Sequence, residues 1–237
     1  MGLKSLLSRP SHQAAKVTTR SVASSSSSVA PAASAKQFFD AIKARRTYYA
    51  LNKSSPILDS QIESIVKDAI LHTPSAFNSQ TARLVLLLNK EHETFWELVK
   101  ASLKPLISEE QFQTTSAKLD GFKAGHGTIL FYEDQDVVKY LEENFTPYAD
   151  KFQQWSEHTS AMHQIVLWTA LEAEGFGANL QHYNPVVDAK AAEQWNVPST
   201  WNLKAQLVFG GRVEGQAPGE KEFKPVEGER LRVFGQA

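Results

Sequence analysis

The stretch ARRTYY at residues 44–49 and the stretch TPSAFNSQ at residues 73–80 carry most of the information about this chain. In the first stretch, Arg45, Arg46 and Thr47 end an apolar stripe that has helical spacing. Guanidinium groups match phosphate oxygens in a bidentate manner, and a hydroxyl adds a neutral donor, so the stretch predicts a phosphate cradle. It also leaves open a simpler reading, in which two cations stabilise a helix C-terminus.

The second stretch brings hydroxyl and amide side chains close together. Ser75, Asn78 and Gln80 offer donors and acceptors that can recognise the polar edge of a heterocycle such as a flavin. The same residue types are common in surface turns, so a turn without a binding role remains the alternative.

Apolar periodicity on either side of these stretches predicts helices and strands in alternation. After the helix that ends at 45–47, helices are expected at 58–71, capped by Asp59, and at 91–106, 108–117, 137–144, 158–174 and 189–195. Strands are expected at 84–88, 128–132, 178–181, 204–209 and 231–234. This alternation favours an α/β or α+β sandwich with helices on the faces of a sheet.

Composition excludes several classes of function. The 237 residues have a formal net charge of −1, so there is no basic excess that calls for nucleic acid. The absence of cysteine excludes a disulfide framework, a thiolate zinc site, an iron–sulfur cluster and a cysteine nucleophile. No Gly-x-Gly-x-x-Gly or Gly-x-Ser-x-Gly motif occurs, and His158 and His163 lack the spacing of a helical metal pair. No apolar run is long enough for a membrane span.

Residues 1–36 differ in composition from residues 37–237. They contain lysine and arginine but no acidic residue, and Ser24 to Ser28 form an unbroken serine run. Such a segment buries too little apolar surface to fold alone, and its composition is that of a mitochondrial transit peptide. We therefore expect a disordered, transit-peptide-like tail before one folded domain at 37–237. The alternative is an unstructured tail without a targeting role, on a protein of the cytoplasm.

Taken together, the two stretches resemble the nitroreductase family, in which both motifs occur in this order and at this spacing. Further stretches are similar to the yeast fatty-acid-repression nitroreductase-like branch of fungal and bacterial proteins. They are GFKAGHGTILFYED at 121–134, GANLQHY at 177–183 and ERLRVFG at 229–235. The resemblance covers about residues 36–237. It implies a dimeric α+β fold whose mostly antiparallel sheet is flanked by helices and which binds FMN.

The family pattern implies which residues contact FMN. Arg45, Arg46 and Thr47 are expected at the phosphate or the ring edge, and Ser75, Asn78 and Gln80 at the FMN of the other subunit. The backbone of Leu180, Gln181 and His182 is expected beside the flavin N5. A second basic cluster usually completes the phosphate site in this family, and the candidates in this chain are Lys221 and Arg230, followed by Lys224 and Arg232.

One position departs from the family pattern. Many nitroreductases carry Lys or Arg where this chain has Tyr49, and that cation stabilises negative charge on the flavin ring. Lys118 lies near another flavin-contacting position and could substitute. His126 and His182 are open between a role at the site and a structural role. His163 is expected to be structural or at the subunit interface.

The resemblance implies an oxidoreductase that passes electrons from NADH or NADPH, by a ping-pong hydride mechanism, to nitroaromatic, quinone-like or related flat acceptors. No side chain is required as an obligate acid or base, because water can supply protons. The partners expected are a second copy of the chain and a small aromatic substrate, with neither nucleic acid nor membrane. The helix at 158–174 is the candidate for the dimer interface, unless it is buried within one subunit. The alternative function is a flavin-binding regulatory protein of lipid or oxidative-stress signalling with little turnover.

Overall fold

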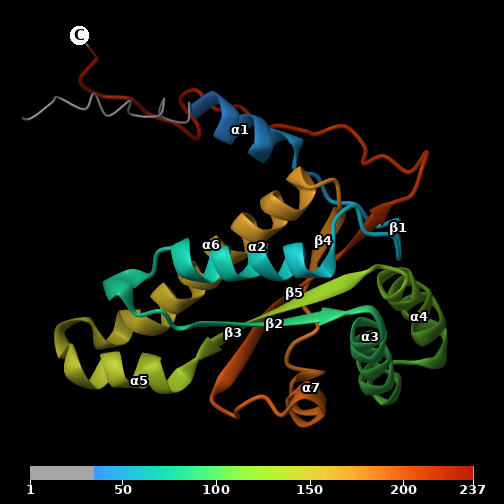
Figure 1. Cartoon of the computed structure of the whole chain (residues 1–237). Helices are drawn as coiled ribbons and strands as arrows, with labels where there is room; N and C mark the ends of the chain where they lie inside the picture. The colour runs from blue at the N-terminus through green and yellow to red at the C-terminus, as the bar shows by residue number, and fades with distance from the viewer. Residues whose placement is uncertain (1–34, 237) are drawn as a thin grey trace, which may run out of the picture. The chain divides into compact units, whose positions relative to one another are not determined.

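An antiparallel sheet forms the centre of the computed structural model, which describes residues 35–236 (Figure 1). Within these residues the strands are β1 (Leu51–Asn52), β2 (Ala82–Leu88), β3 (Gly127–Asp134), β4 (Gly177–Gln181) and β5 (Trp201–Arg212). Strand β5 pairs with β3, β4 and β1, and β2 pairs with β3 at the opposite edge. Every pairing is antiparallel, which confirms the mostly antiparallel sheet expected from the sequence.

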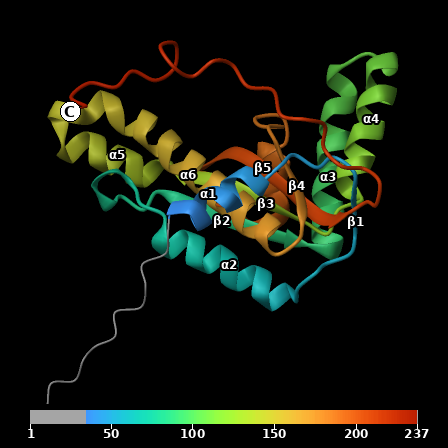
Figure 2. The same cartoon turned by 90° about the horizontal axis from the view of Figure 1, so that it is seen from above.

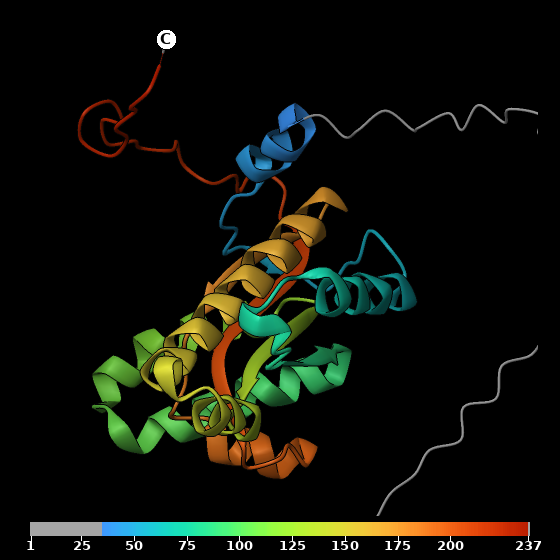
Figure 3. The same cartoon turned by 90° about the vertical axis from the view of Figure 1, so that its left-hand side faces the viewer.

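Helices cover both faces of this sheet. They are α1 (Ala35–Ala44), α2 (Asp59–His72), α3 (Asn89–Leu103), α4 (Glu109–Lys123), α5 (Gln135–Asn144), α6 (Phe152–Ala173) and α7 (Asp188–Trp195). Short 3₁₀ turns lie at Ala76–Asn78, Lys104–Leu106 and Thr146–Lys151. Figures 1 and 3 show α2 and α6 on one side of the strands, with α3, α4 and α7 on the other. The α+β class is therefore confirmed for the described part of the chain.

The two layers follow from the alternation of side chains along the buried strand β3. Ile129 and Phe131 belong to the core under α2 and α6, whereas Leu130 and Tyr132 belong to the core under α3, α4 and α7. Successive side chains of a strand point to opposite faces, so a strand that is buried at every position needs cover on both sides. All eight residues of β3 are buried.

Helix α6 is longer than expected, because it begins at Phe152 rather than near residue 158. Leu167 and Leu171 face the core beneath it, while Ile165 and Val166 are exposed at 39% and 42%. The helix also buries polar residues, among them His163 and Glu172. One face of α6 is thus covered by the core of its own subunit. On another part of the helix surface, Ile165 and Val166 form an apolar strip that is left exposed.

Two local predictions are wrong. The N-cap of α2 is Leu58, whose backbone N–H donates to the side chain of Gln61 at 2.9 Å, and Asp59 is the first residue of the helix. Residues 231–234 do not form a strand, because the side chains of Leu231, Val233 and Phe234 are exposed and no strand of residues 35–236 pairs with them. The short strand β1 was not expected.

The C-terminal segment after β5 leaves the sheet as an extended arch (Figure 2). Lys221 Nζ donates to the carbonyl oxygen of Lys43 at 2.8 Å, which joins residues at opposite ends of the folded unit. Within residues 35–236, no helix is both long enough and apolar enough to cross a membrane. The prediction of a transit-peptide-like tail falls on residues that lie almost entirely outside the described part.

Candidate active site

The segment after α1 is held against the sheet by backbone and side-chain hydrogen bonds. The N–H of Tyr48 donates to the carbonyl oxygen of Ala178 at 2.9 Å, and the side-chain amide of Asn179 donates to the carbonyl oxygen of Tyr48 at 2.8 Å. Both partners belong to β4, so the cationic stretch is fixed to the sheet by its next residues. The positions of residues 45–50 relative to the sheet are therefore fixed by these hydrogen bonds.

A cavity of about 590 Å³ lies between this segment and the C-terminal segment. Its lining comprises Arg45, Arg46, Thr47, Tyr48, Tyr49, Ala50 and residues 216–221, with Lys221 among them. The guanidinium of Arg46 donates to the carbonyl oxygen of Gly219, which links the two walls. We call this space the cationic cavity. Its lining carries two guanidinium groups, one ammonium and the hydroxyls of Thr47, Tyr48 and Tyr49, which are donors that suit a phosphate group, together with the carboxylate of Glu220.

A second cavity, of about 650 Å³, adjoins the first, because Tyr49 and Ala50 line both. Its other lining residues are Lys118, Gly121, Phe122, Gln181 and Tyr183. We call this space the aromatic cavity. Aromatic walls with a few polar groups suit a flat, partly polar ring. Lys118 and Tyr49 line the same space, so the positive charge that Tyr49 lacks is present there on another element.

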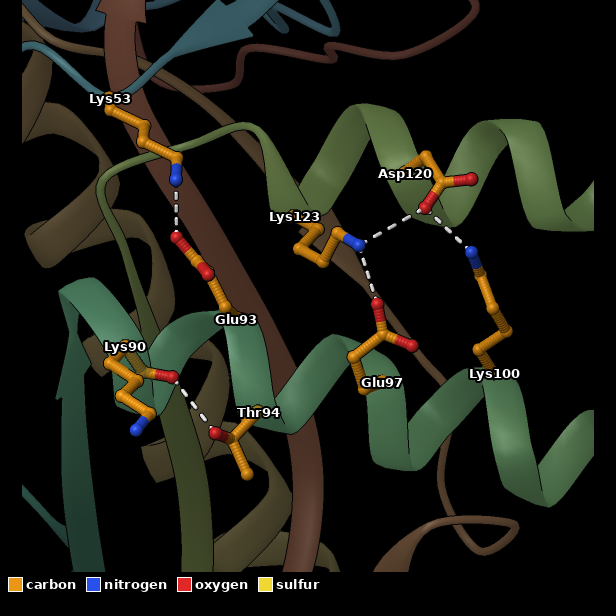
Figure 4. Close-up of polar contacts among 8 residues, drawn as sticks. All are labelled: Lys53, Lys90, Glu93, Thr94, Glu97, Lys100, Asp120 and Lys123. Atoms are coloured by element: carbon orange, nitrogen blue, oxygen red, sulfur yellow. Dashed lines mark hydrogen bonds and ion pairs between the residues drawn. The ribbon is translucent and has the colours of Figure 1, made fainter.

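Helix α4 carries Lys118 and Phe122 into the aromatic cavity, and ion pairs on its other side tie it to α3 (Figure 4). Asp120 accepts from Lys100 at 2.6 Å, and Lys123 pairs with Glu97. The hydrogen bond from Lys100 lowers the pKa of Asp120 below its ordinary range. Each exposed pair contributes little alone, but together they fix the rotation of α4 about its axis.

The loop that contains Ser75, Asn78 and Gln80 lies elsewhere, between α2 and β2. Among the described residues that line the two cavities, none comes from this loop. Phe77, Asn78 and Gln80 have left-handed backbone conformations, with φ of 56°, 51° and 50°. Left-handed non-glycine residues are uncommon, and clusters of them mark loops with a function. Ser75 Oγ accepts from the N–H of Gln80 at 2.9 Å and thereby closes the loop.

The remaining predicted residues divide between the cavities and other places. Gln181 lines the aromatic cavity, Leu180 is half-buried next to it, and His182 is exposed. Arg230 lies in an exposed turn at 226–231 and lines neither cavity, so the structure brings Lys221, and not Arg230, to the cationic cavity.

The histidines whose roles were open are also placed. His126 is buried and shared between Asp59 Oδ1 at 2.8 Å and the carbonyl oxygen of Lys53 at 3.1 Å, which is a structural arrangement. His163 is buried in α6, and its Nδ1 lies 2.9 Å from the carbonyl oxygen of Thr159.

An aromatic cluster surrounds Phe77. Its ring stacks on Trp155 with the centroids 5.9 Å apart, and the cluster also includes Phe145, Tyr148 and Phe152. Phe77 itself is 52% exposed. Phe145, Tyr148 and Phe152 lie about 70 residues from Phe77 in sequence, so their contact with it could not be identified before the fold was known.

The sequence profile of the Nitroreductase family matches residues 42–211, which include the end of α1, residues 45–50 of the cationic cavity, the lining of the aromatic cavity and most of β5. The chain belongs to the nitroreductase family. It is similar to the nitroreductase FRM2 of Saccharomyces cerevisiae, with 36% identity over 188 residues that cover 78% of this chain and 92% of FRM2.

Solved structures of other nitroreductases have the same fold. The nitroreductase CinD of Lactococcus lactis is 44% identical, with a TM-score of 0.76 over 84% of this chain and 100% of CinD, and was solved with nicotinic acid. CinD was also solved with 4-nitrophenol. A protein of Exiguobacterium sibiricum in complex with FMN is 17% identical, with a TM-score of 0.53 over 78% of this chain and 92% of that one. This nitroreductase is therefore an oxidoreductase of the nitroreductase type.

Proposed function

We propose that this nitroreductase binds FMN and passes electrons from NAD(P)H to small, flat aromatic acceptors such as nitroaromatic or quinone-like compounds. The observation that carries the proposal is the pair of adjoining cavities, one cationic and one aromatic, which share Tyr49 and Ala50. A molecule with a phosphate at one end and a flat ring at the other fits this pair of environments.

The cationic cavity holds the phosphate. Arg45 and Arg46 donate guanidinium hydrogen bonds, Thr47 donates its hydroxyl, and Lys221 adds a point charge from the C-terminal segment. Because Lys221 and Gly219 both contact the α1 region, the C-terminal segment forms the second wall of the phosphate site.

The aromatic cavity holds the ring. Phe122, Tyr183 and Tyr49 supply apolar surface, and Gln181 and Lys118 supply polar contacts. Lys118 is exposed and carries the positive charge that favours a negatively charged ring edge. FMN, when bound, supplies the hydride chemistry in a ping-pong sequence, and the protein supplies orientation and a favourable electric field. CinD with nicotinic acid and 4-nitrophenol supports small aromatic molecules as ligands of this fold.

We further propose a homodimer in which Ser75, Asn78 and Gln80 contact the FMN held by the other subunit. Asn78 and Gln80 are exposed on a loop whose backbone is strained, and this loop lines neither cavity of its own chain. Exposed apolar side chains on neighbouring helices offer a surface for the second copy, namely Ile70 and Leu71 of α2 and Ile165 and Val166 of α6. An isologous interface then builds two equivalent sites.

The first test is FMN binding. Purified protein is expected to carry about one FMN per chain, visible in its absorption spectrum. Arg45→Ala removes a charge-assisted hydrogen bond worth about 1.5–3 kcal/mol, so the Kd for FMN should rise roughly tenfold or more. The matched control is Arg230→Ala, which removes the same charge from the exposed turn and should leave the Kd unchanged. An unchanged Kd after replacing both Arg45 and Arg46 would show that the cationic cavity is not the phosphate site.

The second test is anaerobic titration of the FMN-loaded protein with NADH. Fast bleaching of the yellow colour supports the enzyme, whereas very slow bleaching supports the regulatory flavoprotein that Tyr49 leaves possible. Lys118→Met keeps the length of the side chain and removes its charge, so it should slow bleaching with little effect on the Kd for FMN. Lys139→Met, an exposed lysine of α5, is the control and should bleach as fast as the wild type.

A further inference from the structure

A buried carboxylate lies directly beneath the cationic cavity. Glu172, near the end of α6, is 7% exposed. Its two oxygens accept from the backbone N–H of Arg46 at 3.1 and 3.0 Å, across 126 residues of sequence. A buried charge is costly unless hydrogen bonds and opposite charges compensate it. This carboxylate therefore determines where the peptide between Arg45 and Arg46 lies.

The same carboxylate also orients Trp168, the side chain against which Arg45 packs. Glu172 Oε1 accepts from Trp168 Nε1 at 2.9 Å, which fixes the plane of the indole one turn earlier on α6. The guanidinium of Arg45 lies over that indole, 4.4 Å from the ring centroid. A cation over a Trp face is attracted to it, so the direction of the indole sets the direction of Arg45. Glu172 thus acts on Arg46 through the backbone and on Arg45 through Trp168.

Neutralisation of Glu172 comes from a third arginine. Arg212 Nη2 lies 3.6 Å from Glu172 Oε2, and the same guanidinium donates to the carbonyl oxygen of Phe176 at 2.8 Å. Within residues 35–236, neither Arg45 nor Arg46 forms an ion pair with a carboxylate. Their charges are therefore available to a ligand, while Arg212 at the end of β5 balances the buried carboxylate.

Burial raises the pKa of Glu172 above its ordinary value, and the N–H groups of Arg46 and Trp168 act against this effect. These two donors point at the oxygens of Glu172. A glutamine side chain in place of Glu172 would turn its NH₂ group towards at least one of the two donors. An isosteric amide therefore places an NH₂ group against at least the backbone N–H of Arg46, without changing side-chain volume.

We propose that Glu172 is the positioning residue of the phosphate cradle: it fixes Arg46 through its backbone and Arg45 through Trp168, and so gives the site its preference for a phosphorylated flavin. The inference rests on the proposed function, because the ligand it concerns is the phosphate of FMN. Glu172 does not touch the ligand, and its effect is confined to the phosphate end of the site.

The test compares two flavins that differ only in the phosphate. FMN and riboflavin are titrated into apoprotein, and binding is followed by the quenching of flavin fluorescence. Glu172→Gln is expected to raise the Kd for FMN at least tenfold, and the Kd for riboflavin by less than about twofold, since two misplaced charge-assisted bonds affect only the phosphate. Trp168→Phe keeps an aromatic ring at this position and removes the N–H donor. It should therefore also weaken the binding of FMN more than that of riboflavin, but by less than Glu172→Gln does.

Glu174→Gln is the matched control, since Glu174 is exposed two residues further along and its replacement changes the net charge equally. It should bind both flavins like the wild type. An equal loss of FMN and riboflavin in Glu172→Gln would show a merely structural role and overturn the inference, as would an unchanged Kd for FMN. If Glu172→Gln does not fold, the selectivity of Trp168→Phe decides in the same way. Wild-type protein that binds neither flavin would refute the proposed function itself.

Discussion

Glu133 provides a prediction about stability that does not depend on any ligand. It lies on β3 and is fully buried, and within the described residues neither carboxylate oxygen forms a hydrogen bond of normal geometry. Burial raises its pKa from the ordinary 4.5 to about 7, against the hydroxyl of Thr81 and the positive charge of Lys204. The folded protein therefore holds a proton on Glu133 at pH values where the unfolded chain has already lost it.

The sign of the effect follows from proton binding. Between about pH 4.5 and 7 the folded state binds more protons at Glu133 than the unfolded state, so the free energy of unfolding falls as pH rises. The difference in pKa, at 1.36 kcal/mol per unit, corresponds to about 3 kcal/mol over this window. Glu133→Gln resembles the protonated acid at every pH. Relative to the wild type, the variant should gain about 3 kcal/mol between pH 4.5 and pH 8.

His92 acts with the opposite sign. Burial lowers its pKa from 6.5 to about 4, so the unfolded chain takes up a proton first as pH falls through this range, and stability is lost. Its contribution is also about 3 kcal/mol, and between pH 4.5 and 6.5 it offsets that of Glu133. Glu133→Gln keeps the contribution of His92 and lacks that of Glu133, so relative to the wild type it should lose stability as pH falls through this range.

Urea unfolding of apoprotein, followed by tryptophan fluorescence at pH 4.5, 5.5, 6.5 and 8, measures these differences. Glu174→Gln, at an exposed glutamate, is the control and should follow the wild type at each pH. A constant difference between Glu133→Gln and the wild type across the whole range would refute the reasoning, because it would mean that Glu133 titrates alike in both states.

Three further outcomes are expected. Gly210→Ala should destabilise the fold strongly in thermal unfolding, because its Cβ would lie 2.5 Å from the carbonyl oxygen of Asn52, whereas Gly121→Ala, with open space around it, should not lower the Tm. Residues 1–36 fused to a fluorescent reporter should direct it to mitochondria, and a diffuse cytosolic signal would exclude targeting. Mixing homodimers of Arg45→Ala and Asn78→Ala should restore up to half of the FMN sites, and a lack of rescue, or flavin-loaded monomers at equilibrium, would exclude shared sites.

The sequence predicted elements where a single periodicity dominated. The apolar run of β3 and the spacing of Ile62, Val66 and Ala69 in α2 are local signals, and both elements were identified. The two residues of β1 are too few for any period, so that strand could not be predicted. Residues 231–234 are apolar enough for a strand, but a strand also needs a partner, which local sequence does not reveal.

The candidate site divides in the same way. Arg45, Arg46 and Thr47 are adjacent in sequence, and so the cationic stretch was visible before the fold. The hydrogen bonds of Glu172 to Arg46 span 126 residues, and in the sequence Glu172 is an ordinary acid near a helix end. Lys221 could not be distinguished from Arg230, because both lie in a segment whose path depends on contacts with α1. Contacts between residues that are distant in sequence cannot be predicted from local residue patterns and spacing.

Strand β5 has a consequence for how the protein is made. It follows the other four described strands in sequence, and it is the neighbour that β1, β3 and β4 have in common. During synthesis, residues 201–212 leave the ribosome only after those strands. Until then the apolar surfaces of β1, β3 and β4 remain exposed, because β5, the strand with which they pair, is absent. Folding that depends on such distant pairings is slow, and surfaces left open in the meantime favour aggregation. We therefore expect assembly to be largely post-translational, and chains broken off before residue 201 to be substrates for chaperones and proteases.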